Sequence, residues 1–110
     1  KSFIARYGHA YVPMDDSLAR AVVDLSGRFA FVIRAEFERD RVGDLSTEMV
    51  QHFWASFAEH AACNLHIELL YGRNTHHQVE AIFKAVARAV RSAGARDAAL
   101  GRIASTKGTL

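Results

Sequence analysis

Alternating apolar and polar positions predict three strands in the first third of the chain. The expected strands cover residues 5–12, 19–25 and 29–37. The first is rich in aromatic and β-branched residues and stops at Pro13, the only proline, as strands often do. In the third, apolar side chains alternate with Arg34 and Glu36, which is typical of a half-buried strand. Because short turns join the three strands, we expect an antiparallel meander.

Helical spacing of apolar residues predicts two helices in the rest of the chain. The first covers about residues 47–62 after a charged loop, with Ser46 or Thr47 as its cap. One face of this helix carries five apolar residues at helical spacing: Val50, Phe53, Trp54, Phe57 and Ala61. A fourth strand at 64–70 and a loop lead to the second helix, which covers about 76–92 and ends before Gly94.

The second helix is capped by Asn74 or Thr75. Its apolar face carries Val79, Ile82, Phe83, Val86 and Val90. The element order is therefore β-β-β-α-β-α, which predicts an α+β two-layer sandwich: a four-stranded sheet with both helices on one face. A chain this short leaves the other sheet face partly uncovered, which favours a second copy or a partner there.

Composition narrows the class of protein. The chain has 110 residues, half of them hydrophobic and 24% charged, so we expect residues 1–110 to form one ordinary globular domain rather than a disordered chain. The single cysteine, Cys63, excludes an internal disulfide and is expected to be a small buried hydrophobe. A net charge of +2 argues weakly against nucleic-acid binding.

No stretch of the sequence approaches 18 apolar residues, so we expect no transmembrane helix. The first 14 residues carry no long apolar run and no cleavage-site pattern, so we also expect no signal peptide. The cytosol is the expected location.

His76-His77-x-x-Glu80 at the start of the second helix is the clearest candidate for chemistry. At about 100° per residue, His76 and Glu80 lie about 40° apart around the helix and His77 and Glu80 about 60°. Imidazole and carboxylate together suit manganese, iron or zinc. The two histidines diverge by about 100°, so they serve two ions more easily than one. Two surface histidines beside a first-turn acid explain the spacing equally well.

The other histidines carry weaker signals. His52 lies opposite the apolar stripe of the first helix and is expected to be exposed, as an ordinary surface residue or as a ligand whose partners come from another chain. His66 is interpreted as a half-buried, hydrogen-bonded strand residue. His9 and His60 are interpreted as surface residues without a surrounding cluster.

Several cations could hold an anion. Lys84 is placed to pair with Glu80 one turn before it, or to reach an anion near a metal. Arg6 and Arg28 lie at strand edges and turns, and Lys107 lies in a polar tail run beside two hydroxyls. An arginine fork and a lysine point charge are the usual combination for phosphate.

These features together form a recognisable series. Motifs that match a known family in order and spacing are Arg6-Tyr7-Gly8, Pro13-Met14-Asp15-Asp16, Asp24-Leu25-Ser26-Gly27-Arg28, Leu65-His66-Ile67, Gly72-x-Asn74-x-His76-His77-x-x-Glu80-Ala81-x-Phe83-Lys84-Ala85 and Ser105-Thr106-Lys107-Gly108. The chain resembles imidazoleglycerol-phosphate dehydratase of histidine biosynthesis, over nearly all 110 residues. It departs from the family at Asp16, where glutamate is usual, and at Phe29, where proline is usual.

The resemblance covers the C-terminal half of the family's chain. Family members carry two similar halves, and the first half has its own His-His-x-x-Glu run and a glutamate thought to act in proton transfer. The chain is therefore a fragment, an engineered half or one of two separate chains. Because the halves are alike, copies of this half could also assemble with each other, with little or no activity expected without the first half's glutamate.

The resemblance implies roles for individual residues. It implies a two-ion manganese site with ligands shared between subunits of a large symmetric homo-oligomer, and Asp15 near the reacting centre. The implied metal ligands are His52, His76, His77 and Glu80. The implied substrate and phosphate contacts are Arg6, Arg28, Lys84, Ser105, Thr106 and Lys107. His66 also matches a family position, but its structural interpretation is kept.

The sequence is compatible with three functions. The first is the lyase reaction itself, loss of water from imidazole-glycerol phosphate to give imidazole-acetol phosphate. The second is a non-catalytic, metal-binding half-domain that self-assembles. The third is a basic domain that binds nucleic acid, which predicts tight, salt-dependent binding.

Overall fold

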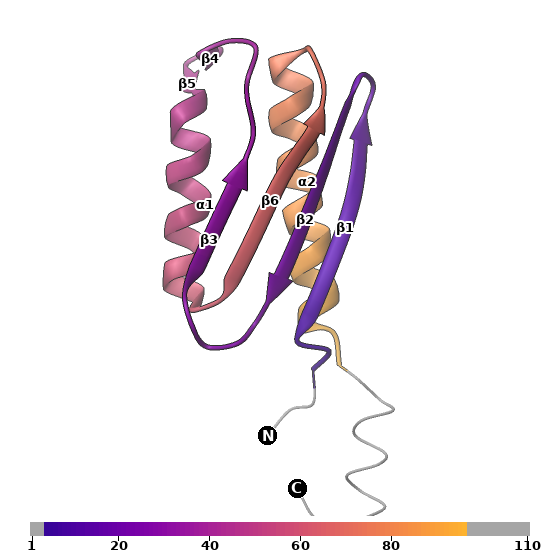
Figure 1. The fold of residues 1–110 in the computed structure, drawn as a ribbon, viewed down its shortest axis with the longest axis vertical. Helices are drawn as coiled ribbons and strands as arrows, with labels where there is room; N and C mark the ends of the chain where they lie inside the picture. The colour runs from indigo at the N-terminus through magenta and orange to yellow at the C-terminus, as the bar shows by residue number, and fades with distance from the viewer. Residues whose placement is uncertain (1–3, 97–110) are drawn as a thin grey trace, which may run out of the picture.

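Two helices cover one face of a four-stranded sheet, and the other face is open (Figure 1). The structure, a computed structural model, describes residues 4–96. The strands of the sheet are β1 (Tyr7–Met14), β2 (Ser17–Asp24), β3 (Ala30–Arg34) and β6 (Asn64–Tyr71), and the helices are α1 (Thr47–Ala61) and α2 (Thr75–Gly94). A small hairpin of β4 (Arg41–Val42) and β5 (Leu45–Ser46) forms within and just after the charged loop. The predicted α+β two-layer sandwich is confirmed.

The strand order differs from the predicted meander. The sheet runs β1-β2-β6-β3, so β6 lies between β2 and β3. It pairs antiparallel with β2 and parallel with β3. A parallel pair needs a long crossover, and α1 supplies it between β3 and β6. The prediction of a three-stranded meander was therefore wrong, because β2 and β3 follow each other along the chain without pairing.

Capping side chains set the starts of both helices, whereas β1 and α2 extend further toward the C-terminus than expected. Ser46 caps α1 by accepting a hydrogen bond from the backbone N–H of Glu48, and Asn74 caps α2 in the same way through His77. β1 continues through Pro13 to Met14 rather than stopping before it, which an edge strand tolerates because a proline there breaks no ladder on its free side. Helix α2 includes Gly94 instead of ending before it.

Small inward-facing residues let α2 lie close to the sheet. The inward positions of β2 include Ala19, Ala21 and Val23, all with no exposed surface. They alternate along the strand with partly buried or exposed residues. Cys63 is also fully buried, as expected. The core lies between the sheet and the two helices, and α2 packs chiefly on β1 and β2.

Helix α1 covers the edge of the sheet at β3, and its apolar face is only partly buried (Figure 1). Val50 and Trp54 are buried, as predicted. Phe53 is 51% exposed and packs sideways, with its ring stacked 5.5 Å from that of Phe83 on α2. Ala61, expected on the buried face, is exposed in the last turn. Because α1 lies at the edge of the sheet, only part of its apolar face contacts the sheet, and the rest stays exposed.

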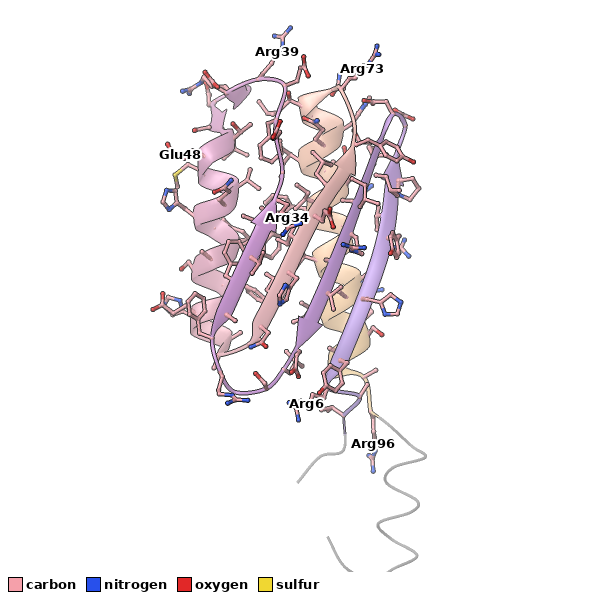
Figure 2. The ribbon with its side chains drawn as sticks, in the orientation of Figure 1. Arg6, Arg34, Arg39, Glu48, Arg73 and Arg96 are labelled. Carbon is pink, nitrogen blue, oxygen red and sulfur yellow. The ribbon has the colours of Figure 1, made fainter. Side chains whose placement is uncertain are left out.

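The open sheet face carries a mixed set of polar and apolar side chains. His66 is exposed there rather than half-buried, because its position in β6 points away from the helices. It shares a shallow hollow with His9, which is exposed on the surface, as expected. The other residues that line the hollow are Tyr11, Arg20, Val22, Val32, Arg34, Ile67 and Glu68. Figure 2 shows Arg34 on this face.

Within residues 4–96, neither helix combines the length and the apolar character needed to cross a membrane.

Gly8 is the point of closest approach between β1 and α2. A methyl group built on it would lie 2.1 Å from the carbonyl oxygen of Ala89 and 2.6 Å from the backbone nitrogen of Ala93. Both are backbone atoms of α2, so no side-chain rotation relieves the clash. We expect Gly8→Ala to lower the free energy of unfolding by about 3 kcal/mol, near the top of the usual range for overpacking. Urea denaturation followed by circular dichroism measures this.

The matched control is Gly94→Ala, because a methyl group at Gly94 meets nothing within 4 Å. If Gly8→Ala were as stable as the native chain, α2 would not lie as close to β1 at Gly8 as the structure shows.

Candidate functional site

The start of α2 presents two histidines and a glutamate at one end of the sheet. The β6–α2 loop turns at Gly72, whose φ of 152° lies outside the range that other residues usually adopt. Asn74 then caps the helix, so His76 and His77 fall in its first turn. The helix geometry predicted from the spacing is thus confirmed.

His76 and Glu80 form one side of this group. His76 Nε2 lies 3.3 Å from Glu80 Oε1, and Lys84 Nζ lies 3.1 Å from the other carboxylate oxygen. The hydrogen bond from Lys84, more than any other contact, lowers the pKa of Glu80. The predicted Glu80–Lys84 pair is therefore present, and the carboxylate is held in its ionised form.

His77 faces the β1–β2 turn instead. Its Nδ1 lies 2.7 Å from Asp16 Oδ1, and its Nε2 lies 3.3 Å from Asp15 Oδ2. The hydrogen bond to Asp16 is the main reason that the pKa of His77 is raised. The two histidine rings are 6.2 Å apart and inclined at 72°. This agrees with the prediction that adjacent histidines diverge.

Asp16 is the residue that sequence reasoning missed. Its Oδ2 accepts hydrogen bonds from the backbone N–H groups of Arg73 and Asn74, at 2.6 and 2.9 Å. These two bonds, followed by the one to His77, hold the pKa of Asp16 well below its usual range. Its hydrogen-bond partners lie 57 to 61 residues further along the chain. The only signal for Asp16 in the sequence was therefore its place in a family motif, where glutamate is usual.

Asp15 adopts a left-handed backbone conformation, with φ of 49°. Non-glycine residues with positive φ are uncommon, and they gather in turns and at functional sites. The described residues contain three: Asp15, Arg6 and Ala62. Ala62 is explained as the left-handed cap of α1. Asp15 and Arg6 are both candidate site residues.

The donor types fit a divalent transition metal, but one chain supplies an incomplete set. Imidazole nitrogens and a carboxylate are suitable ligands for manganese. In residues 4–96, however, no three histidine, cysteine, aspartate or glutamate side chains lie close enough to hold an ion. His52 is exposed on α1, as predicted, and does not join the α2 group. A complete site would need ligands from a second half-domain.

The candidate phosphate arginines lie at the opposite end of the sheet. Arg6 precedes β1, whereas Asp15 follows the end of that strand. A strand of eight residues spans roughly 25 Å. Figure 2 shows Arg6 near the lower end and Arg73, in the loop before the histidines, at the upper end. Arg28, in the β2–β3 loop, is also at the lower end, because β2 runs down from the β1–β2 turn.

Arg6 is held in place by several contacts. Its Nε and one terminal nitrogen donate to the two carboxylate oxygens of Asp24, at 2.7 and 3.3 Å. Its guanidinium lies 5.1 Å from the centre of the Tyr7 ring. The pair with Asp24 raises the pKa of Arg6. The remaining N–H groups are free of Asp24 and could donate to an anion.

The remaining predicted phosphate contacts divide between α2 and the C-terminal part of the sequence. Ser105, Thr106 and Lys107 lie outside the described residues. Lys84 is described and is half exposed on α2 at the histidine end. The structure thus groups Lys84 with the histidines, Glu80 and Asp15, and it separates this group from Arg6 and Arg28.

Comparison with known proteins gives a consistent answer. A sequence model of the family described as imidazoleglycerol-phosphate dehydratase matches residues 1–90. A protein of that name from Salinibacter ruber is 64% identical over all 110 residues, which make up 54% of its length. Its namesake from Zymomonas mobilis is 52% identical over the whole chain and 57% of its own length. The chain spans about half the length of these curated relatives.

Solved structures agree. The crystal structure of imidazoleglycerol-phosphate dehydratase from Staphylococcus aureus matches 88% of this chain and 57% of its own, with a TM-score of 0.86 and 43% identity. The Pyrococcus furiosus protein, solved in complex with (S)-C348, matches all of this chain and 60% of its own, with a TM-score of 0.80 and 32% identity.

Proposed function

Because this chain belongs to the imidazoleglycerol-phosphate dehydratase family, we propose that it is the C-terminal half of a hydro-lyase of histidine biosynthesis. The reaction removes water from D-erythro-imidazole-glycerol phosphate and gives imidazole-acetol phosphate. The observation that carries the proposal is the group at the start of α2, where His76 and Glu80 converge and His77 faces Asp15.

The metal-binding part of the proposal assigns His52, His76, His77 and Glu80 as manganese ligands. Bound manganese would supply Lewis-acid stabilisation of negative charge on the substrate's imidazole ring. His76, His77 and Glu80 present their donors at the exposed start of α2, where a second set of ligands can approach, whereas His52 lies apart on α1. Lys84 keeps Glu80 ionised, so the carboxylate is ready to bind a cation.

Proton transfer needs a positioned acid or base. Asp15 is the candidate in this chain because its carboxylate lies exposed beside His77 Nε2. The family's first half is expected to add its own glutamate. The hydrogen that leaves is on a carbon that is not acidic, so the reaction depends on both positioning and charge stabilisation.

The phosphate-binding part assigns Arg6, Arg28, Lys84, Ser105, Thr106 and Lys107 to the substrate, chiefly to its phosphate. Arginine offers two parallel N–H donors and lysine a mobile point charge, and together they hold a phosphate in one position and orientation. Holding the phosphate also fixes the distance from the imidazole ring to the metal ligands.

The active site is proposed to be shared between half-domains. The roughly 25 Å between Arg6 and the α2 histidines is far longer than a three-carbon phosphate chain. One half-domain therefore gives its histidine end to one site and its arginine end to another. The open sheet face, with Val22 and Val32 more than a third exposed, offers a surface for a second half-domain in a symmetric assembly.

The second candidate is a metal-binding half-domain that assembles without catalysing the reaction. The absence of a three-ligand group in residues 4–96 favours it for a chain that acts alone. Both candidates place the same residues at the metal, and they differ only in turnover.

A dehydratase assay separates the two candidates. The purified chain is tested with manganese, alone and after refolding with the first half of the Salinibacter ruber relative, and imidazole-acetol phosphate is measured. We expect no turnover alone and turnover in the mixture. An inactive mixture that nevertheless binds manganese would support the non-catalytic candidate.

Lys107→Ala tests the phosphate assignment in the active mixture. A charge-assisted hydrogen bond contributes about 1.5–3 kcal/mol, so we expect KM to rise roughly 10- to 100-fold. Arg91→Ala is the control, because it removes an exposed cation from the last turn of α2. A KM for Lys107→Ala equal to that of the control would count against the phosphate role.

A further inference from the structure

Asp16 uses its two carboxylate oxygens for two different tasks. Oδ2 accepts from the backbone N–H groups of Arg73 and Asn74, which fixes the loop before α2. Oδ1 is 2.7 Å from Nδ1 of His77. The same side chain therefore fixes both the backbone that precedes the histidine and the histidine ring itself.

We infer that Asp16 is a positioning residue for His77: it holds the neutral imidazole with its proton on Nδ1 and leaves the lone pair of Nε2 for a metal ion. An ionised carboxylate can only accept hydrogen bonds, so Nδ1 must carry the hydrogen. In a neutral imidazole the lone pair is then on Nε2. This inference rests on the proposed function, because orienting the His77 ring serves catalysis only if His77 binds the metal.

The arrangement matches what metal-binding histidines require. Such histidines usually donate their second N–H to a carboxylate or carbonyl, which sets the tautomer and the ring orientation. His77 Nε2 lies 3.3 Å from Asp15 Oδ2, whereas Nδ1 lies 2.7 Å from Asp16 Oδ1, so Asp16 is the closer acceptor and decides which nitrogen carries the hydrogen. Asn74 also caps the helix through the backbone N–H of His77. The β6–α2 loop thus holds the backbone N–H of His77, and the β1–β2 turn holds its ring plane and tautomer.

A purely structural role for Asp16 makes a different prediction, and Asp16→Asn separates the two. The asparagine oxygen can still accept from Arg73 and Asn74 and keep the loop in place. Its NH₂ group then faces His77 Nδ1 and donates to it, which requires the lone pair on Nδ1 and moves the proton to Nε2. The loop survives and the tautomer changes, as happens when the carboxylate of a catalytic triad becomes an amide.

The tautomer is measured by long-range ¹H–¹⁵N NMR on the isolated chain, without metal, at a pH above the titration of His77. We expect Nδ1–H in the native chain, Nε2–H in Asp16→Asn and a return to Nδ1–H in Asp16→Glu. His60 is the internal reference, because its Nδ1 bonds the backbone carbonyl of Ser56 at 2.8 Å and does not contact Asp16.

Manganese alone is the second probe, read as paramagnetic broadening of the His77 ring signals. Loss of a carboxylate that orients a ligand costs about 10- to 100-fold in metal affinity. We expect Asp16→Asn to need that much more manganese for equal broadening, and Asp16→Glu to restore the native response.

Two outcomes would overturn the inference: an unchanged His77 tautomer in Asp16→Asn, or a changed tautomer in a variant that manganese broadens as readily as it broadens the native chain. A third outcome concerns the proposed function alone. If the native tautomer depends on Asp16 but manganese never broadens His77, the ligand assignment fails while the positioning by Asp16 is supported.

Discussion

His77→Ala is expected to reduce the manganese affinity of the proposed shared site by more than about 100-fold, beyond the loss typical of a residue that only orients a ligand. The change removes one of the proposed metal ligands outright. The fold should persist, because Asp16 keeps its bonds to the backbone of Arg73 and Asn74. Metal content by elemental analysis and far-UV circular dichroism measure the two effects, and Glu80→Ala should behave in the same way.

His60→Ala is the matched control. It removes an exposed imidazole from the last turn of α1, where the ring contacts only Ser56 of its own helix among the contacts described. Unchanged manganese content in His77→Ala would remove this residue from the metal site, and an equal loss in His60→Ala would show that the effect is not specific.

Val32→Lys is expected to break the assembly of half-domains. Val32 is 44% exposed on the open sheet face, beside Arg34 and opposite His66 in β6. A second half-domain packed there would bury a new ammonium group beside Arg34, where the nearby Glu68 already pairs with Arg20, and a buried charge without its own partner costs several kcal/mol. Sedimentation velocity should show a species larger than one chain for the native protein and the mass of one chain for the variant.

Leu45→Lys is the control, because Leu45 is 40% exposed in the β4–β5 hairpin rather than on the sheet. It should keep the native sedimentation. A native chain that sediments as a monomer, or a Val32→Lys variant that assembles like the native chain, would contradict a role for the open face.

Local pattern was enough to predict the four sheet strands and both helices, but it missed the β4–β5 hairpin and the pairing of the sheet strands. The alternation in β3 and the helical spacing in α2 placed these elements within a few residues. The insertion of β6 between β2 and β3 was missed, because an apolar strand looks alike whichever neighbour it joins. The exposure of His66 was missed for a related reason, because its burial depends on which face of the sheet the helices cover, and local pattern does not show this.

The candidate site shows a similar division. The convergence of His76 and Glu80 could be predicted, because helix geometry fixes residues four apart. The contact of His77 with Asp16 could not, because it joins a hairpin turn to a helix across 61 residues. The separation of Arg6 from the histidines also needed the direction of β1, which no local motif encodes.

The measurement that tests the shared site most directly is complementation between two inactive variants. Arg6→Ala and His77→Ala are each assembled with the first half, then dissociated together, reassembled and assayed. If each site takes its arginines and its histidines from different chains, random mixing gives about a quarter of such sites with both native residues. We predict that the mixture recovers activity in this proportion. A mixture as inactive as its two parents would mean that one chain supplies both residues to the same site.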